Sequence, residues 1–179
     1  MKVAIIDYGS GNLHSAAKAF QKALTEIGKG TVIITSDPKE IEQSSHVVLP
    51  GVGSFRQCKN AVLSISGMMD SLKTHVSIKK QPFLGICVGM QLMAELGEEN
   101  GKTKGFGWIR GSVVPLAPPR FANLKIPHMG WNDLEISKPV HPVLADIPDF
   151  AHAYFVHSFH FNAKHPSDVL AQVDYGEPI

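Results

Sequence analysis

The chain has 179 residues, of which 44% are hydrophobic and 18% charged, which is enough for one globular domain with a sizeable core. Its 17 basic and 16 acidic side chains give a formal net charge of +1. This balance excludes a strong field for nucleic acid or anionic lipid, and favours a small substrate or a protein partner.

The two cysteines, Cys58 and Cys87, have neither disulfide-framework nor zinc-site spacing. No apolar stretch is long enough to cross a bilayer, and the N-terminus lacks the basic region of a signal peptide. We therefore expect a protein of the reducing cytoplasm that is not attached to a membrane and needs no metal or other cofactor.

Short apolar runs alternate with helical patterns in the first half of the chain. Strands are expected at residues 3–6, 31–35, 47–49 and 82–86. Helices are expected at residues 16–27, after Ser36 or Asp37, at residues 55–76, and from Cys87 to Gly97. This alternation predicts an α/β fold, with an open, mostly parallel sheet and helices on both faces.

After Gly101 the pattern changes to short aromatic and glycine-rich segments. Strands are expected at residues 108–115, 125–134, 153–161 and 169–173, with no helix of comparable length. We interpret this half as an antiparallel β extension of the same domain, so that residues 1–179 form a single domain.

Cys87 lies where the fourth expected strand meets a helix, with Gly85 before it and Gly89 after it. The pattern Gly-x-Cys-x-Gly matches the nucleophile elbow, in which a sharp turn exposes the nucleophile and glycines let strand and helix approach closely. The helix dipole there favours a thiolate. A small buried cysteine could give the same pattern, so the motif alone leaves both interpretations open. Cys58 has no such glycines, and we interpret it as a core residue.

Attack by a thiolate on a carbonyl group also needs hydrogen-bond donors for the oxyanion that develops. The backbone amide of Val88 is one candidate. A second candidate lies in Pro50-Gly51-Val52-Gly53, because ligands of open α/β sheets bind beyond the carboxyl ends of the strands. An ordinary turn would have the same composition, but two such loops after consecutive strands favour a site.

Five segments carry a resemblance to a known family. They are residues 5–13 (IIDYGSGNL), 49–53 (LPGVG), 85–91 (GICVGMQ), 127–132 (PHMGWN) and 154–158 (YFVHS). Through them the chain resembles the class I glutamine amidotransferases. The first and fourth segments make it most similar to the glutaminase subunits of imidazole glycerol phosphate synthase, an enzyme of histidine biosynthesis.

The resemblance implies that Cys87 attacks the side-chain amide of glutamine, so that a glutamyl thioester forms, ammonia leaves and water releases glutamate. It implies an oxyanion hole of the Val88 and Val52 amides, the latter after a peptide reorientation linked to the partner. Substrate contacts are implied for Gly51, Gly53, Gln91, His157, Ser158 and Phe159.

The resemblance also implies a partner, a (β/α)₈ cyclase subunit that receives the ammonia through a channel within a heterodimer. Residues implied at the interface are Asn12, Trp131 and Tyr154. Amphipathic aromatic side chains suit an interface, and packing in the core is the alternative for both.

The chain departs from the family near its end. The family completes its triad with a His and a Glu in a Gln-Phe-His-Pro-Glu segment, which these 179 residues do not contain. His165-Pro166-Ser167-Asp168 and His141-Pro142-Val143 lie too early and lack the Glu. We therefore expect the sequence to be incomplete at its C-terminus and the 179-residue chain to lack glutaminase activity. Phe159 also replaces a tyrosine of the family.

The sequence alone leaves several other functions as alternatives. The glutaminase of pyridoxal phosphate biosynthesis would share the elbow but not residues 127–132, and a Cys-elbow chaperone or hydrolase would not need Gln91. A dinucleotide site at Gly9-Ser10-Gly11 lacks its third glycine, which His14 replaces. An inactive partner-binding subunit would need no base. A glutamine-mimicking electrophile separates an inert chain from a catalytic one.

Overall fold

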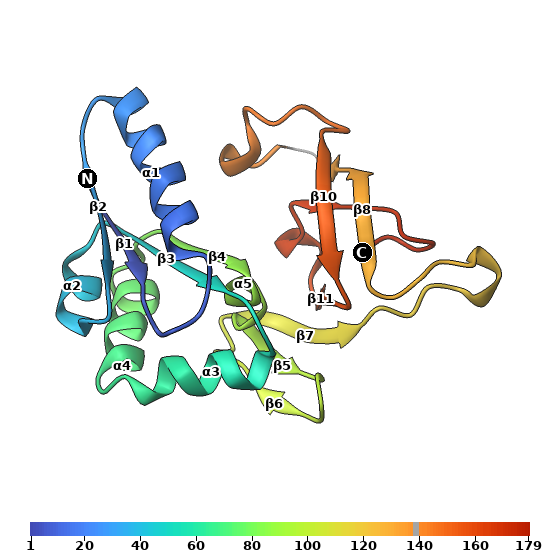
Figure 1. Ribbon diagram of the computed structural model, residues 1–179, viewed down its shortest axis with the longest axis horizontal. Helices are drawn as coiled ribbons and strands as arrows, with labels where there is room; N and C mark the ends of the chain where they lie inside the picture. Colours follow the sequence, from blue (N-terminus) through green and yellow to red (C-terminus); the bar gives the residue numbers. More distant parts are fainter. Residues whose placement is uncertain (138–139) are drawn as a thin grey trace. The chain divides into compact units, whose positions relative to one another are not determined.

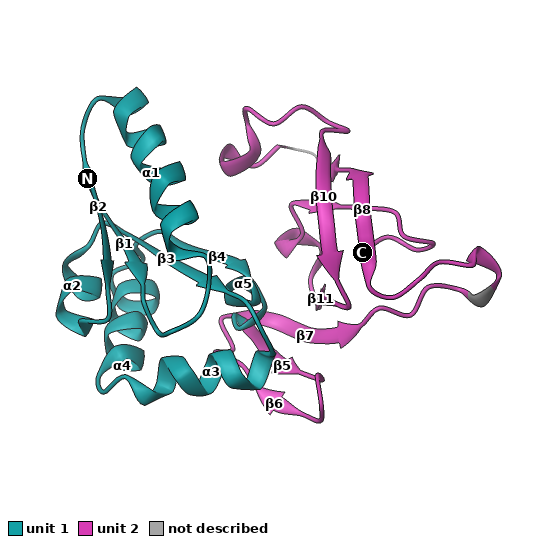
Figure 2. Cartoon of the chain, in the orientation of Figure 1, with its two compact units in different colours: residues 1–93 teal, residues 94–179 magenta. Residues whose placement is uncertain are grey.

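The computed structural model describes residues 1–137 and 140–179, which form two compact units, Met1–Met93 and Ala94–Ile179 (Figure 2). The boundary between the units follows the cysteine elbow. The single domain expected over residues 1–179 stays a prediction.

The first unit alternates strands with helices. Its elements are β1 (Lys2–Ile6), α1 (Leu13–Ile27), β2 (Thr31–Thr35), α2 (Pro38–Gln43), β3 (His46–Gly51), α3 (Phe55–Ser64), α4 (Met68–Lys73), the π-helix η1 (Thr74–Ile78), β4 (Phe83–Cys87) and α5 (Val88–Gln91). The four strands form a parallel sheet in the order β2-β1-β3-β4. The predicted parallel sheet is confirmed.

Local sequence signals set the ends of the first two helices. The Asn12 side chain accepts a hydrogen bond from the Ser15 amide at 3.3 Å and caps the start of α1. Gly28, with φ of 81°, ends the same helix in the left-handed conformation that favours glycine. The Asp37 side chain accepts from the Lys39 amide at 2.9 Å at the start of α2. Gly28 and Asp37 stand at the predicted boundaries, whereas α1 begins three residues earlier than the expected residue 16.

The two central strands of the parallel sheet, β1 and β3, are buried on both faces. Val3, Ile5 and Val48 pack with Ala17 and Leu24 of α1. The other core residues of this unit, on the sheet and on α2 to α4, are Ala4, Ile6, Ile41, Val47, Leu49, Phe55, Val62, Met68 and Leu72. Figure 1 shows α1 on one side of the sheet and α2 and α4 on the other. Strands buried on both faces explain the unalternated apolar runs of the sequence.

The helix expected over residues 55–76 is wrong as one continuous element. It is interrupted between α3 and α4, where Gly67 adopts φ of 80°, and its end is the π-helical turn η1. A positive φ cannot belong to a right-handed helix, so the chain changes direction there.

The helix expected from Cys87 to Gly97 is also wrong beyond its first turn. α5 ends at Gln91, and Ala94–Gly97 forms strand β5. β5 pairs with β7 (Ile109–Pro115) in parallel and with β6 (Thr103–Lys104) in antiparallel fashion. Pairing with strands elsewhere in the chain therefore outweighs the helical spacing of the apolar residues in Ala94–Gly97.

The second unit consists of short strands and single 3₁₀ turns. Besides β5, β6 and β7 it contains η2 (Arg120–Ala122), β8 (His128–Asp133), β9 (Glu135–Ile136), η3 (Pro142–Leu144), β10 (His152–His157), β11 (Phe159–Ala163), η4 (Pro166–Asp168) and β12 (Ala171–Gln172). The sheets are β11-β7-β5-β6, β10-β8 and β12-β9. In neither unit is a described helix long and apolar enough to span a membrane.

Two strands expected in this unit are shorter than the sequence patterns suggested. Residues 125–127 precede β8 and only Ala171–Gln172 of the 169–173 pattern pairs. The strand expected at residues 153–161 is two strands, β10 and β11, separated at Ser158. β10 pairs with β8 and β11 pairs with β7, so a single straight strand cannot serve both partners.

Candidate functional site

Cys87 occupies a strained backbone position at the junction of β4 and α5. Its φ of 54° and ψ of −118° lie outside the regions that non-glycine residues favour. The residue is exposed and its thiol is free. Such strain persists only where the surrounding structure enforces it, and it concentrates at functional sites. The geometry is that of the elbow expected from the sequence, although the helix is a single turn, so the dipole invoked above is short.

The two glycines that flank Cys87 leave no room for a side chain. A Cβ atom on Gly89 would lie 1.7 Å from the Leu49 carbonyl oxygen, and one on Gly85 would lie 2.5 Å from the Met90 backbone. The obstacles are backbone atoms, which cannot rotate away as a side chain can. Close contact between β3, β4 and α5 therefore requires both glycines, and this contact holds the elbow in place.

The Pro50–Gly53 segment begins beside the elbow. Gly51 at the end of β3 is the register partner of Cys87 at the end of β4. A Cβ atom on Gly51 would lie 2.7 Å from the Gly89 nitrogen and 2.9 Å from the Tyr8 hydroxyl oxygen. The two loops that the sequence predicted to converge thus leave neighbouring strands at the same edge of the sheet.

Three side chains hold the backbone of this segment. The Tyr8 hydroxyl donates to the Pro50 carbonyl at 2.7 Å, and the Ser10 hydroxyl donates to the Val52 carbonyl at 2.6 Å. The Cys58 thiol donates to the same Val52 carbonyl at 3.3 Å. We call Tyr8, Ser10 and Cys58 the loop clamp.

The loop clamp was missed by the sequence analysis, which assigned no role to Tyr8 or Ser10. Cys58 is 2% exposed, as expected of a core residue, but its sulfur also makes a polar contact. Burial, followed by the neighbouring Cys58 thiol, raises the pKa of the Tyr8 hydroxyl. Tyr8 therefore stays protonated and remains a hydrogen-bond donor. The only signal in the sequence was the Gly-Ser-Gly turn after the first strand.

The other predicted residues of the first unit lie on α5 and at the start of α1. Val88 is buried and is the first residue of α5, where a backbone amide has no acceptor within its own helix. Gln91 is the last residue of that helical turn and is partly buried. Asn12 caps α1 with its side chain, which gives it a structural role whatever it contacts elsewhere.

The remaining predicted substrate residues, His157, Ser158 and Phe159, lie in the second unit at the junction of β10 and β11. The Ser158 carbonyl accepts from the Leu116 amide at 2.9 Å. His157 Nδ1 lies 3.0 Å from the Phe159 carbonyl oxygen, and its Nε2 lies 3.0 Å from Nδ1 of His128. Hydrogen bonds therefore fix this junction.

His128 is a buried structural residue. Its ring stacks on those of Tyr175 and Phe155, with centroids 3.9 and 4.9 Å away. Burial, followed by the electrostatic effect of the neighbouring His157, lowers the pKa of His128. The environment thus favours the neutral imidazole of His128, paired with His157.

Trp131 and Tyr154 form an exposed aromatic pair on the β8–β10 sheet. They are register partners with ring centroids 5.5 Å apart, and they are 72% and 56% exposed. Met129 and Val156, the next pair on this face, are exposed as well. Core packing, the alternative weighed for the two aromatic residues, is not what the structure shows.

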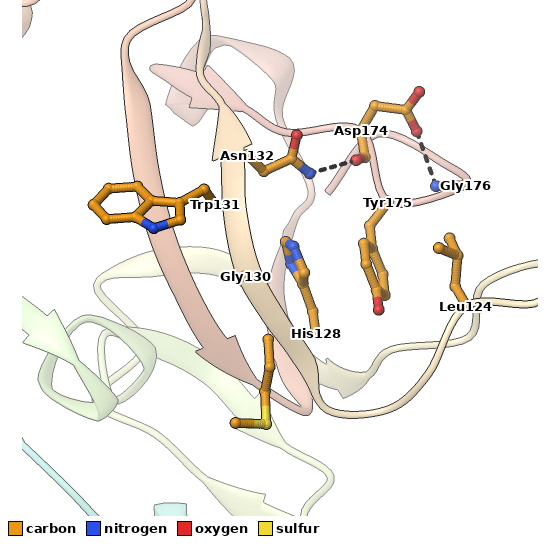
Figure 3. Close-up of a pocket in the computed structure, with 9 residues that line it drawn as sticks. Leu124, His128, Gly130, Trp131, Asn132, Asp174, Tyr175 and Gly176 are labelled. Carbon is orange, nitrogen blue, oxygen red and sulfur yellow. Dashed lines mark hydrogen bonds between the residues drawn. The ribbon is translucent and has the colours of Figure 1, made fainter.

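A hollow of about 400 Å³ lies on the other side of β8, and Figure 3 shows Trp131 pointing away from it. Its lining residues are Leu124, His128, Met129, Gly130, Trp131, Asn132, Asp174, Tyr175 and Gly176. The side-chain amide of Asn132 donates to the Asp174 backbone carbonyl at 2.7 Å across this hollow. It contains neither a cysteine nor any predicted substrate residue, so the elbow is the better candidate site.

Within residues 1–137 and 140–179, no group of three or more His, Cys, Asp or Glu side chains is arranged to hold a metal ion.

A parallel α/β sheet with an exposed cysteine on a strained strand-to-helix turn has the geometry of the nucleophile-elbow proteins. The model of the family "Glutamine amidotransferase class-I" matches residues 4–177. The chain belongs to the class I glutamine amidotransferase family.

Two similar proteins share the same name. The protein called "Imidazole glycerol phosphate synthase subunit HisH" from Rhodopseudomonas palustris is 52% identical over the whole chain, and its namesake from Cereibacter sphaeroides is 49% identical. The chain spans 84% of the length of each.

Solved structures support the same fold. A structure described as a glutamine amidotransferase aligns with 99% of this chain and 82% of its own length, with a TM-score of 0.68 and 16% identity. A glutamine amidotransferase from Thermotoga maritima aligns with 91% of this chain and 63% of its own length, with a TM-score of 0.61 and 18% identity.

Proposed function

We propose that the chain is the glutaminase subunit of imidazole glycerol phosphate synthase and that Cys87 is its nucleophile. One observation carries the proposal: an exposed cysteine held at φ of 54° between two glycines that backbone contacts make obligatory. Relatives at about half identity that bear this subunit's name support the choice of substrate.

The reaction proceeds in two stages. The Cys87 thiolate attacks the side-chain carbonyl carbon of glutamine, a carbon–sulfur bond forms, and the carbonyl electrons move to oxygen. When the carbonyl re-forms, the carbon–nitrogen bond breaks and protonated nitrogen leaves as ammonia. Water then attacks the thioester, the carbon–sulfur bond breaks, and glutamate and the free thiol are released.

The negative oxygen of both stages needs donors, and we assign them to the backbone amides of Val88 and Val52. Val88 opens α5, and Val52 follows the strand next to the elbow. The residues that we assign to glutamine binding are Gly51, Gly53, Gln91, His157, Ser158 and Phe159. We assign the general base to none of His128, His157 and His160, because the family draws that His from a segment that these 179 residues do not contain.

Labelling by a glutamine-mimicking chloroketone tests the nucleophile, because alkylation needs a bound glutamine analogue and a reactive thiol. We expect one equivalent of label at Cys87, protection by glutamine, and no label in Cys87→Ala. The Cys58→Ser variant is the matched control and should still be labelled at Cys87, since Cys58 is buried. An unlabelled Cys87 in the folded protein would leave only an inert partner-binding subunit.

We further propose that the ammonia passes through a channel to a (β/α)₈ cyclase subunit in a cytoplasmic heterodimer. The exposed Trp131–Tyr154 pair supports an interface on the second unit, because aromatic residues of this kind are enriched at interfaces. Asn12 is the interface residue that we assign in the first unit.

Trp131→Ala tests the interface. Loss of a central aromatic contact should weaken binding to the purified cyclase subunit by roughly 30-fold, while the unfolding free energy changes by less than about 0.5 kcal/mol. Phe121→Ala, which removes another exposed aromatic ring, is the control and should leave the affinity unchanged. Equal affinities for the two variants in a titration would place the interface elsewhere.

A further inference from the structure

A chain of hydrogen bonds with a defined direction joins β8 to the β10–β11 junction. The Phe159 carbonyl oxygen can only accept, so Nδ1 of His157, 3.0 Å away, carries a hydrogen. A neutral His157 then has its lone pair on Nε2, which accepts from Nδ1 of His128 at 3.0 Å. Both neutral rings therefore adopt the Nδ1–H tautomer, and the lone pair of the His128 ring lies on its Nε2.

This Nε2 atom is accessible from the hollow beside β8. His128 is 3% exposed and is one of the residues that line the hollow. Among the described residues, the buried side-chain nitrogen and oxygen atoms without a partner are His75 Nδ1 and His160 Nδ1. Nε2 of His128 makes no hydrogen bond within the described part of the chain and is not one of these two atoms. It therefore offers an unused acceptor to the hollow.

Aromatic stacking fixes the direction of this acceptor. The His128 ring stacks on the rings of Tyr175 and Phe155, and Figure 3 shows His128 and Tyr175 side by side. Tyr175 is itself held, because its hydroxyl donates to the Lys125 carbonyl at 2.6 Å. A ligand would meet an acceptor that is already in place, so binding would not have to order this side chain.

The lining residues favour a cation over an anion. When His128 is neutral, Asp174 alone among the described lining residues has an ionised side chain. Its Oδ1 accepts from the Gly176 amide at 2.9 Å, and its backbone carbonyl accepts from Asn132. The carboxylate is thus held at the wall of the hollow. A fixed lone pair and a fixed carboxylate together suit a cation with N–H donors.

We propose that the hollow beside β8 binds the guanidinium group of a small molecule, which donates an N–H to Nε2 of His128 and pairs its charge with the Asp174 carboxylate. Guanidinium fits because it presents several N–H donors in one plane, stacks on aromatic rings and is more weakly hydrated than ammonium. The volume of about 400 Å³ lies in the range of small-molecule sites. This site does not involve Cys87 and does not depend on the proposed function.

Methylguanidinium is the probe, titrated into the isotope-labelled 179-residue chain and followed by long-range proton–nitrogen spectra of the histidine rings. Before the titration, His128 and His157 should both show the Nδ1–H tautomer. We expect a dissociation constant of about 1 mM, as so small a ligand allows, with the largest shift at Nε2 of His128. Tetramethylammonium, a cation without N–H donors, and acetate should leave this nitrogen unshifted.

Two variants test the assigned contacts. His128→Phe keeps a ring for stacking but removes Nε2, and should weaken binding at least about 10-fold, as expected for a hydrogen bond to a charged group. Asp174→Asn removes the charge but keeps an acceptor for the Gly176 amide, and should weaken binding about 3-fold. Asp168→Asn is the matched control, because Asp168 lies on η4 and does not line the hollow. It should leave the affinity unchanged.

Three results would each overturn the site. They are an Nε2–H tautomer of His128 in the wild type, equal binding of tetramethylammonium, and an affinity for methylguanidinium that His128→Phe does not change. If His128→Phe does not fold, His157→Phe decides in its place. Loss of the His157 acceptor lets His128 carry its hydrogen on Nε2, so the binding-competent tautomer becomes less populated and the affinity should fall about 3-fold. An unchanged affinity in that variant overturns the site as well.

Discussion

Replacement of Gly89 by alanine is the sharpest perturbation of the elbow, because the added carbon has no space. It would lie 1.7 Å from the Leu49 carbonyl oxygen, and real contacts of this kind are essentially never shorter than 3.0 Å. The backbones of β3 and α5 must therefore separate by at least 1.3 Å, although Leu49 is completely buried.

The expected loss of unfolding free energy follows from the contacts that this separation breaks. A displacement of that size removes the hydrogen bonds of the Leu49 peptide to its neighbouring strand, at about 1 kcal/mol each, and adds the cost of overpacking, about 1–3 kcal/mol. We expect Gly89→Ala to lower the unfolding free energy by about 3 kcal/mol or more. Misplacement of the thiol should also slow chloroketone labelling of Cys87 by roughly 100-fold.

Urea denaturation and the labelling rate measure the two effects. Gly28→Ala is the matched control: Gly28 has φ of 81°, but a Cβ atom there meets nothing within 4 Å. It should cost only about 1 kcal/mol of conformational strain and leave labelling unchanged. If Gly89→Ala were no less stable than this control and were labelled at the wild-type rate, the steric account of the elbow would be refuted.

Three further predictions concern stability, each measured by urea denaturation. Asn12→Ala should cost about 1 kcal/mol through loss of the α1 cap; no loss would mean that the cap is dispensable. Leu72→Ala, in a buried position, should cost about 2–5 kcal/mol, against less than about 1 kcal/mol for the exposed Leu63→Ala. Burial, followed by the electrostatic effect of His157, lowers the pKa of His128 below its ordinary 6.5. The contribution of neutral His128 to the unfolding free energy is therefore complete above pH 6.5 and is lost as the pH falls through the lowered pKa. His128→Gln should flatten that fall, and an unchanged slope would contradict the assignment.

The parallel sheet and the elbow could be predicted because their signals are local. Val3 to Ile6 and Val47 to Leu49 are continuous apolar runs, as strands buried on both faces require. Gly85 and Gly89 stand at fixed offsets from Cys87, and the structure shows a backbone obstacle at each. A short stretch of sequence is enough to encode such features.

The elements that were predicted wrongly depend on distant partners. Ala94 to Gly97 carries apolar residues that also fit a helix, and it becomes a strand because Ile109–Pro115 pairs with it. Ser158 interrupts an apparently continuous strand because β10 and β11 have different neighbours. Neither choice can be read from the segment alone, since the energy of a ladder belongs to both strands.

The loop clamp could not be predicted from the sequence for the same reason, although two of its residues lie in a segment that carries the family resemblance. Ser10, Val52 and Cys58 meet only because β1 and β3 are neighbours in the sheet and α3 follows the loop. Cys58 was correctly expected in the core, yet the direction of its sulfur depends on a carbonyl six residues away.

Gly51 connects the loop clamp to the elbow. A Cβ atom on Gly51 would lie within 3.0 Å of the Tyr8 hydroxyl, the Gly89 nitrogen and Val88 Cβ. A side chain at position 51 would therefore force the Pro50–Gly53 backbone away from these neighbours. The strained position of Cys87 is thus enclosed by a close approach of backbones, in which glycine is required at positions 51, 85 and 89.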